Sequence, residues 1–398
     1  MKGNAPEHSV EALLKRSDDG RYIDPSVGTL SGEGSHQQTK PARAQPHGAE
    51  PAQVFSSVPS IWEGQQAEPT YYGKPAIKSP VWIWTIPAYF FVGGLAGAAM
   101  ALASAAQLFG GKRMTHFAQR AHWVGAVGGG VSSALLIADL GRPSRFLNML
   151  RVFRPTSPMS VGSWVLAAAT PCSLGAALFY QSEGLLPMLC GTGAAVFGIP
   201  LAGYTGVLLA NTAVPVWQQG RRSLPVLFTS SSMNSAAGIL KLIPLSPGAY
   251  DIVHTFGVVG AVVELAASEA FEMEVSQVEQ VGKPLREGVS GALWKMAKAL
   301  TAASLVVALV PGRSRRMRQT AGILAALGSL CLRFALFHAG KVSARDPRAT
   351  FGQQRAGFGG FEVTREPSIT GPETKQVPHP VPAPKTREEI WNVPQLTP

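Results

Sequence analysis

Six polar side chains interrupt the apolar segments of this sequence, and their chemistry suits hydrogen bonding and proton transfer. They are Tyr89, Asp139, Tyr204, Asn234, Glu264 and Arg333. A tyrosine hydroxyl can donate a hydrogen bond, and a carboxylic acid can take up or release a proton. Because polar groups are costly within lipid, those that persist there usually have a function. The set therefore predicts a polar site within otherwise apolar segments.

Glu264 and Arg333 lie inside their apolar segments and could form an ion pair. An unpaired charge at that depth would cost about 2.5–3.5 kcal/mol. The pair could be purely structural, or it could face a water-filled crevice without a function. If Glu264 is unpaired, it becomes a candidate proton carrier. Asn234 lies in the middle of its segment and joins these two residues as a candidate for a proton path.

Asp139 and Tyr204 each have a structural alternative. Asp139 precedes a loop that contains Arg142 and Arg145, so it is either an anchor of that loop or a proton exit. Tyr204 lies about two turns before the end of its segment. Its hydroxyl either meets a backbone carbonyl in the interior or takes part in a binding site. The sequence leaves both alternatives open.

The polar residues belong to eight apolar segments that must position them. These segments are residues 81–109, 122–140, 163–180, 186–211, 225–242, 250–271, 291–310 and 320–340. Each is apolar all round and close to the length of about 20 residues that crosses a membrane. No alternation of the β-barrel type is visible. We therefore predict an all-α integral membrane protein, a bundle of about eight transmembrane helices over residues 80–345. Residues 1–79 and 346–398 are predicted to be polar, disordered tails.

Composition and charge exclude several classes of function. Only 15% of the residues are charged, and the net charge of +11 arises mainly from short loops between apolar segments. This placement fits membrane topology and argues against nucleic-acid binding. The three cysteines form neither a CxxC nor a CxxCH motif, so no iron–sulfur cluster and no c-type haem are expected in this chain. A b-type haem needs two axial histidines on facing helices at the same depth in the membrane, and only His122 and His254 begin their segments at a shared depth. We expect no b-type haem, and no metal site, in this chain.

Helix order and flanking charge predict an orientation. Eight spans place both termini on one side of the membrane. The basic residues that flank the bundle on that side are Lys74, Lys78, Lys341, Arg345 and Arg348. The positive-inside rule therefore places both termini in the cytoplasm. All the polar residues named first, apart from Asn234, then fall in the half of the membrane nearer the termini, where we expect one polar pocket.

Two sequence blocks resemble a known family of membrane proteins. The first is Pro80-Val81-Trp82-Ile83-Trp84 followed by Tyr89-Phe90-Phe91-Val92-Gly93-Gly94-Leu95-Ala96-Gly97. The second is Asp139-Leu140-Gly141-Arg142-Pro143-Ser144-Arg145-Phe146, leading to Thr156-Ser157-Pro158-Met159-Ser160 and Gly162-Ser163-Trp164. They resemble the first helix and the second-to-third helix loop of the NrfD/PsrC family, the membrane subunits of polysulfide, nitrite and related reductases. The resemblance covers about residues 70–345.

The resemblance implies a quinone site and two kinds of partner. Family members bind a quinone, menaquinone or ubiquinone, near their interface with a ferredoxin-like iron–sulfur subunit, which often serves a molybdopterin catalytic subunit. Tyr89 and Tyr204 match the family's pocket positions, with Trp84 at the start of the first helix. Asp139 matches the acidic residue that ends the second helix. Some relatives carry Asn and His near the start of helix one, where this chain has Ile86 and Tyr89.

We therefore expect a quinone-reactive anchor subunit in a bacterial-type inner cell membrane, which does not itself act on the terminal substrate. Asp139 and Glu264 are its predicted catalytic acids. Coupled proton translocation is a further expectation, carried by Asn234, Glu264 and Arg333. The loop basic residues predicted to dock the partner are Arg142, Arg145, Arg151 and Arg154.

Two other classes of function stay open. One is a transporter without a redox role, in which Pro171, Pro200 and Pro215 would break helices, although no convincing inverted repeat is visible. The other is a purely structural anchor for soluble enzymes. The presence of Tyr89, Tyr204 and Asp139 argues against this structural alternative.

Overall fold

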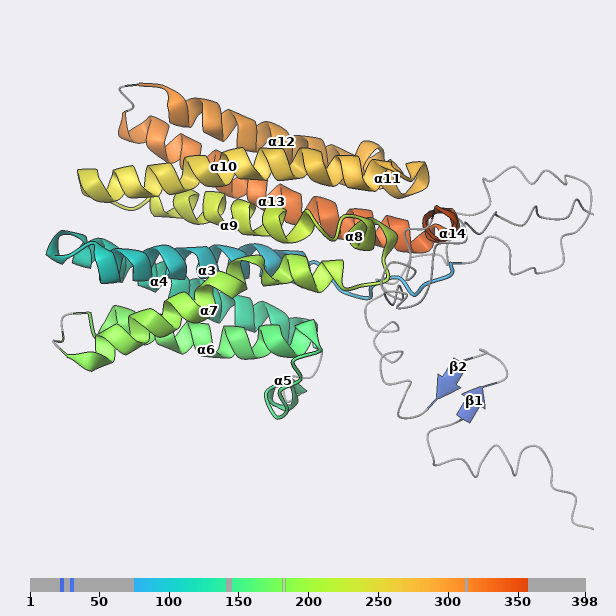
Figure 1. The fold of residues 1–398 in the computed structure, drawn as a ribbon, viewed down its shortest axis with the longest axis horizontal. Helices are drawn as coiled ribbons and strands as arrows, with labels where there is room; N and C mark the ends of the chain where they lie inside the picture. The colour runs from blue at the N-terminus through green and yellow to red at the C-terminus, as the bar shows by residue number, and fades with distance from the viewer. Residues whose placement is uncertain are drawn as a thin grey trace, which may run out of the picture. The chain divides into compact units, whose positions relative to one another are not determined.

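The computed structural model describes residues 22–24, 29–31, 75–140, 145–180, 182, 184–311 and 314–356. Within them, eight long helices form the bundle shown in Figure 1. Their bounds are α3 Thr85–Phe109, α4 Thr115–Asp139, α6 Pro158–Leu178, α7 Leu185–Ala210, α9 Leu224–Leu240, α10 Pro247–Ser276, α12 Gly288–Leu309 and α13 Arg315–Arg345. Each matches one predicted apolar segment, which confirms the all-α membrane fold. Most of the predicted tails, residues 1–79 and 346–398, lies outside the described residues.

Seven of the eight long helices in the described chain are long and apolar enough to cross a membrane. The exception is α9, which has 17 residues. At a rise of about 1.5 Å per residue this helix is shorter than the ~30 Å hydrocarbon core of a bilayer. The predicted count of about eight spans therefore resolves into seven helices of full spanning length and one short interior helix.

The bundle has two halves joined through α9. Helices α3, α4, α6 and α7 pack together, and α10, α12 and α13 pack together on the other side (Figure 1). Helix α9 contacts α3 and α7 of the first half as well as α10 and α13 of the second. In the described part of the chain, α9 therefore packs against two helices of each half. Its buried residues lie between the two halves.

Serine hydroxyls make the buried position of α9 possible. Ser230, Ser231, Ser232 and Ser235 are all at most 2% exposed. Ser230 and Ser232 donate to the carbonyl oxygens of Val226 and Phe228 one turn earlier, each at 2.8 Å. These internal bonds satisfy the hydroxyls without water, and small side chains let neighbouring helices approach closely. The sequence of α9 thus favours burial among helices over contact with lipid.

The short helices include η3 Lys112–Met114, α5 Arg145–Met149, α8 Pro215–Gln219, α11 Glu279–Arg286 and α14 Pro347–Arg355. Helix α14 contacts α8, α11 and α13, so packed structure continues past the boundary predicted at residue 345. Strands β1 Tyr22–Asp24 and β2 Thr29–Ser31 form an antiparallel pair. Pro171 and Pro200 lie inside α6 and α7, which continue through them, so neither residue breaks its helix as the transporter alternative requires.

Close packing of α3 on α7 depends on Gly97. A Cβ atom at this position would lie 2.6 Å from both the Ala202 amide nitrogen and the Gly198 carbonyl oxygen. We expect Gly97→Ala to separate the two helices and to lower the melting temperature of the purified protein by several degrees. Gly130→Ala is the matched control, since a Cβ there meets no atom within 4 Å. Equal melting temperatures for the two variants would contradict this account of the contact.

Candidate functional site

Two tyrosines meet in the first half of the bundle. Tyr89 lies in the first turns of α3, and Tyr204 lies in the last turns of α7. The two helices run in opposite directions, so these turns lie side by side. A side-chain hydrogen bond links Tyr89 and Tyr204. Tyr89 is 3% exposed and Tyr204 is half-buried. The structure therefore brings the two predicted pocket tyrosines together, and the hydroxyl of Tyr204 meets another side chain.

Helix α6 makes room for the ring of Tyr204 at Gly162. A Cβ atom at position 162 would lie 1.8 Å from the Tyr204 Cζ atom and 2.2 Å from its hydroxyl oxygen. Any larger residue would have to displace the ring. The absence of a side chain at Gly162 therefore lets the Tyr204 ring lie where its hydroxyl can reach Tyr89.

A third hydroxyl lies close to the tyrosine pair. Ser132 of α4 is fully buried, and its Oγ has no hydrogen-bond partner among the described residues. A Cβ at Gly93 would be 2.8 Å from this Oγ and 3.6 Å from the Tyr89 ring, so both groups border the same glycine. A buried polar atom without a partner is uncommon and often marks a place for a ligand or water. The sequence analysis missed Ser132, because one serine in an apolar helix gives no signal.

Asp139 ties the end of α4 to the start of α3. One carboxylate oxygen accepts from the Ile83 amide at 3.4 Å and from the Thr85 hydroxyl at 3.5 Å. The carboxylate also interacts electrostatically with Lys341 of α13. Asp139 is thus an anchor between the end of α4, the start of α3 and α13. The side chains of Arg142 and Arg145, the partners considered from sequence, lie outside the described residues.

Of the two tryptophans that precede α3, Trp82 packs against the core, whereas Trp84 is 63% exposed. The Trp82 ring stacks on Trp217, with 6.0 Å between centroids. The Trp82 carbonyl oxygen accepts from Lys341 Nζ at 2.6 Å. Sequence reasoning did not assign Lys341 to the site, although a lysine in the last turns of an apolar helix was the available signal. Trp82, Lys341 and Asp139 together fix the entry of the chain into α3.

A second polar cluster surrounds Glu264 in the other half of the bundle. Glu264 of α10 is 1% exposed. Its carboxylate accepts from Asn234 Nδ2 of α9 at 2.9 Å and from Thr301 Oγ1 of α12 at 3.4 Å. A side-chain hydrogen bond from Ser231 adds a further partner. The predicted proximity of Asn234 and Glu264 is therefore present, and three helices supply the polar groups.

Arg333 interacts with Glu264 only at a distance. Among the described residues no ion pair within 4 Å joins them, although their charges attract. Arg333 Nη2 donates to the Phe228 carbonyl at 2.9 Å and to Ser232 Oγ at 3.1 Å, and the guanidinium lies 3.8 Å from the centre of the Phe228 ring. Its Nε and Nη1 are buried without a hydrogen-bond partner. Instead of the direct pair that the sequence allowed, Arg333 contacts Phe228 and Ser232 of α9.

The two clusters do not merge into the single pocket expected from helix order. Phe90 and Phe228 lie between them, with 6.3 Å between ring centroids. Phe90 contacts Tyr89 on one side, and Phe228 contacts Arg333 on the other. Depth along each helix was predicted from sequence, but the direction of each side chain around the helix axis was not. That direction places the tyrosines and Glu264 on opposite sides of an aromatic layer.

The predicted docking residues lie at the end of α4 and beyond it. Arg151 and Arg154 are exposed in the segment after α5. The Arg154 amide donates to Ser160 Oγ at 3.0 Å, which fastens this segment to the start of α6. Arg142 is outside the described residues, as is the side chain of Arg145. Two of the four predicted basic residues are thus placed on an accessible surface.

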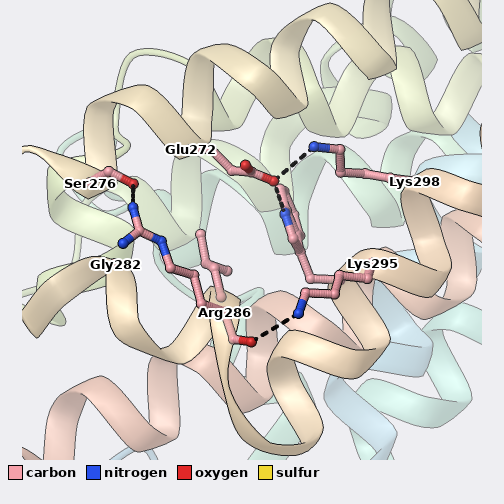
Figure 2. Close-up of a pocket in the computed structure, with 8 residues that line it drawn as sticks. Glu272, Ser276, Gly282, Arg286, Lys295 and Lys298 are labelled. Atoms are coloured by element: carbon pink, nitrogen blue, oxygen red, sulfur yellow. Dashed lines mark hydrogen bonds and ion pairs between the residues drawn. The ribbon is translucent and has the colours of Figure 1, made fainter. Parts of the chain in front are cut away.

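A separate cavity of about 320 Å³ lies where α10, α11 and α12 meet (Figure 2). Its lining residues are Glu272, Ser276, Gly282, Leu285, Arg286, Trp294, Lys295 and Lys298. None of the residues predicted from sequence lines this cavity, and no tyrosine does. This charged cavity is therefore distinct from the tyrosine site.

Comparison with known proteins identifies the family. Residues 75–344 match the family model described as polysulphide reductase, NrfD, which covers most of the chain and nearly all of the helical bundle. A search of curated proteins gave no match. The family consists of multi-pass membrane subunits of oxidoreductases, in agreement with the seven apolar helices of spanning length found here. The chain belongs to the polysulphide reductase NrfD family of membrane proteins.

Proposed function

We propose that this chain is a quinone-reactive membrane subunit that passes electrons between membrane quinone and a ferredoxin-like iron–sulfur partner. The observation that carries the proposal is the buried pair of Tyr89 and Tyr204, which joins α3 to α7 close to the carboxylate-bearing end of α4. A redox partner of this kind would in turn serve a catalytic subunit, such as a molybdopterin enzyme. This chain would then be the membrane electron carrier of a larger oxidoreductase.

The residues present fit a quinone head group. Such a head group needs a hydrogen-bond donor at each carbonyl oxygen and an apolar surface on its ring faces. Tyr89 and Tyr204 carry two hydroxyl donors, one of which makes their mutual hydrogen bond, and the unpartnered Ser132 hydroxyl is a third. Phe90 supplies an aromatic neighbour. When bound, quinone supplies two-electron redox chemistry that requires protons.

Each residue of this chain then has a defined task. The Tyr89 and Tyr204 hydroxyls would exchange their mutual hydrogen bond for bonds to the carbonyl oxygens, and the absence of a side chain at Gly162 leaves room for the Tyr204 ring. Asp139 would accept or release protons at the end of α4, where it interacts electrostatically with Lys341. The stacked Trp82 and Trp217 rings would shield this end of the bundle from water. Trp84, which is 63% exposed, would contact lipid or the partner at the membrane–water interface.

The second cluster suits proton movement coupled to the redox step. Glu264, Asn234 and Thr301 form a hydrogen-bonded set inside the half of the bundle that holds no quinone tyrosine. Arg333 lies between this set and the aromatic layer, and its two unpartnered nitrogens could hold water. Both termini would face the cytoplasm of a bacterial-type cell, with Arg151 and Arg154 on the partner-binding side.

Purification with native partners in mild detergent tests the proposal, followed by quinone extraction and iron analysis. We expect quinone to accompany the chain, and iron to be present only when a partner protein co-purifies. The transport alternative makes the opposite prediction, namely a chain that purifies alone, without quinone, and moves a solute across vesicle membranes. That outcome would overturn the redox assignment.

A further inference from the structure

The cavity at α10, α11 and α12 is built from the ends of two spanning helices and the short helix between them. Glu272 and Ser276 come from the last turns of α10, Gly282 and Arg286 from α11, and Lys298 with its neighbours from α12. Figure 2 shows Ser276 with Arg286 on one side of the cavity and Glu272 with Lys298 on the other. Because α10 and α12 cross the membrane and α11 connects them, the cavity lies near the membrane–water boundary.

The charges on the cavity wall do not cancel. Lys298 is held by two carboxylates, at 2.5 Å from Glu269 and 2.9 Å from Glu272. Trp294 also donates its indole N–H to Glu272. Lys298 thus holds both carboxylates at close range, and Arg286 attracts Glu272 from a longer distance. Lys298, Arg286 and Lys295 carry three positive charges against the two negative charges of Glu269 and Glu272, so a net charge of +1 remains.

Arg286 and Lys295 make their direct hydrogen bonds to neutral groups. Arg286 Nη2 donates to Ser276 Oγ at 2.9 Å, and Lys295 Nζ donates to the Arg286 carbonyl at 3.2 Å. Both partners are neutral, and in the described part of the chain no carboxylate lies within 4 Å of either cation. Each has donors left over, since an ammonium has three and a guanidinium five. The wall therefore presents two cations that suit a bound anion.

The helices that form the cavity wall also expose apolar side chains. Met273 follows Glu272 along α10 and is 67% exposed, and Met296 follows Lys295 along α12 and is 45% exposed. Val289, in the first turn of α12, is 69% exposed. A ligand that places an anionic head group in the cavity and hydrocarbon against these side chains must be amphipathic. That combination favours a lipid over a free inorganic anion.

We infer that this cavity binds the anionic phosphate of a membrane phospholipid, at a site distinct from the tyrosine pair. Arg286 and Lys295 bind the phosphate oxygens, and Ser276 holds the guanidinium in position. The chemistry that the cavity recognises is a phosphate with at least one negative charge. The site is independent of quinone reactivity, so its failure would leave the proposed redox function untouched.

Purified full-length protein with its native partners, in detergent, tests the site by thermal stability and native mass spectrometry. Phosphatidylglycerol is expected to raise the melting temperature more than phosphatidylcholine and to stay bound in the mass spectrum. The double variant Arg286→Gln/Lys295→Gln should bind phosphatidylglycerol at least about tenfold more weakly, because each removed cation loses a charge-assisted hydrogen bond. Lys295→Gln alone should show a smaller loss in the same direction, and it is the safer variant because Lys295 is exposed.

Lys283→Gln is the matched control. This substitution removes one positive charge from α11, the helix that carries Arg286. Lys283 itself pairs with Glu287 at 3.7 Å and does not line the cavity. Equal phosphatidylglycerol binding by the double variant, Lys295→Gln and wild type would overturn the inference. Inorganic phosphate added without lipid forms the second arm: stabilisation as large as that by phosphatidylglycerol would overturn the assignment to a lipid and keep only a phosphate site.

Discussion

Tyr204→Phe is expected to lower quinol-dependent electron transfer by about 10- to 100-fold. The substitution removes the hydroxyl that meets Tyr89 but keeps the ring that packs on Gly162. One lost hydrogen bond to a reacting carbonyl, together with a lost route for its proton, accounts for this size of effect. Tyr89→Phe should act in the same direction. Reduction of the iron–sulfur partner by a water-soluble quinol, followed in membranes, measures both.

Tyr250→Phe is the control for these variants. Tyr250 is also largely buried, at 8% exposure, but it lies at the start of α10 and stacks on His254, far along the chain from the tyrosine pair. Its loss should leave quinol turnover unchanged. If all three variants kept full turnover, the tyrosine pair could not be the quinone site, and the redox assignment would lose its main support.

Gly162→Ala provides a second route to the same result without touching a hydroxyl. The added Cβ would overlap the Tyr204 ring, so the ring must move away from Tyr89. Turnover should fall as in Tyr204→Phe, with the melting temperature lowered as well because an overpacked side chain is displaced. The double variant Gly162→Ala/Tyr204→Phe should be little worse than either single change, since both act on one hydroxyl. Additive losses would show that Gly162 acts elsewhere.

Glu264→Leu is expected to reduce the free energy of unfolding by about 3 kcal/mol. The leucine would leave Asn234 and Thr301 without their acceptor and Arg333 without the negative charge that attracts it. All four side chains are at most 2% exposed, so water cannot replace the lost contacts. Unfolding by SDS in mixed micelles measures the change.

Glu264→Gln separates the structural role of this residue from a role in proton transfer. The amide oxygen still accepts from Asn234 or Thr301, so most of the stability should remain, whereas the titratable proton is gone. In vesicles that hold the whole complex, we expect quinol turnover to continue while acidification coupled to it disappears. Unchanged acidification would assign Glu264 to structure alone. Glu279→Gln, an exposed carboxylate change on α11, should affect neither stability nor acidification.

The sequence by itself determined the fold class and much of the tyrosine site. Apolar segments of membrane length predicted the helices, because lipid leaves the backbone no other way to satisfy its hydrogen bonds than a helix or a closed barrel. Helix direction alone placed Tyr89 and Tyr204 at one depth, and the structure joins them. The two blocks around Tyr89 and Asp139 led to the family that the comparison then confirmed.

Only the tertiary structure decided how the polar residues group. Glu264 and Arg333 both lie in the predicted half of the membrane, yet Arg333 turns toward Phe228 and Ser232 rather than toward Glu264. The direction in which a side chain points around its helix axis depends on how the helix packs against neighbours that are distant in sequence. The cavity near Arg286 and Lys295 was invisible for the same reason, since its walls come from three helices. Arg286 belongs to a predicted loop and Lys295 to a predicted apolar segment, and only packing brings both to one cavity wall.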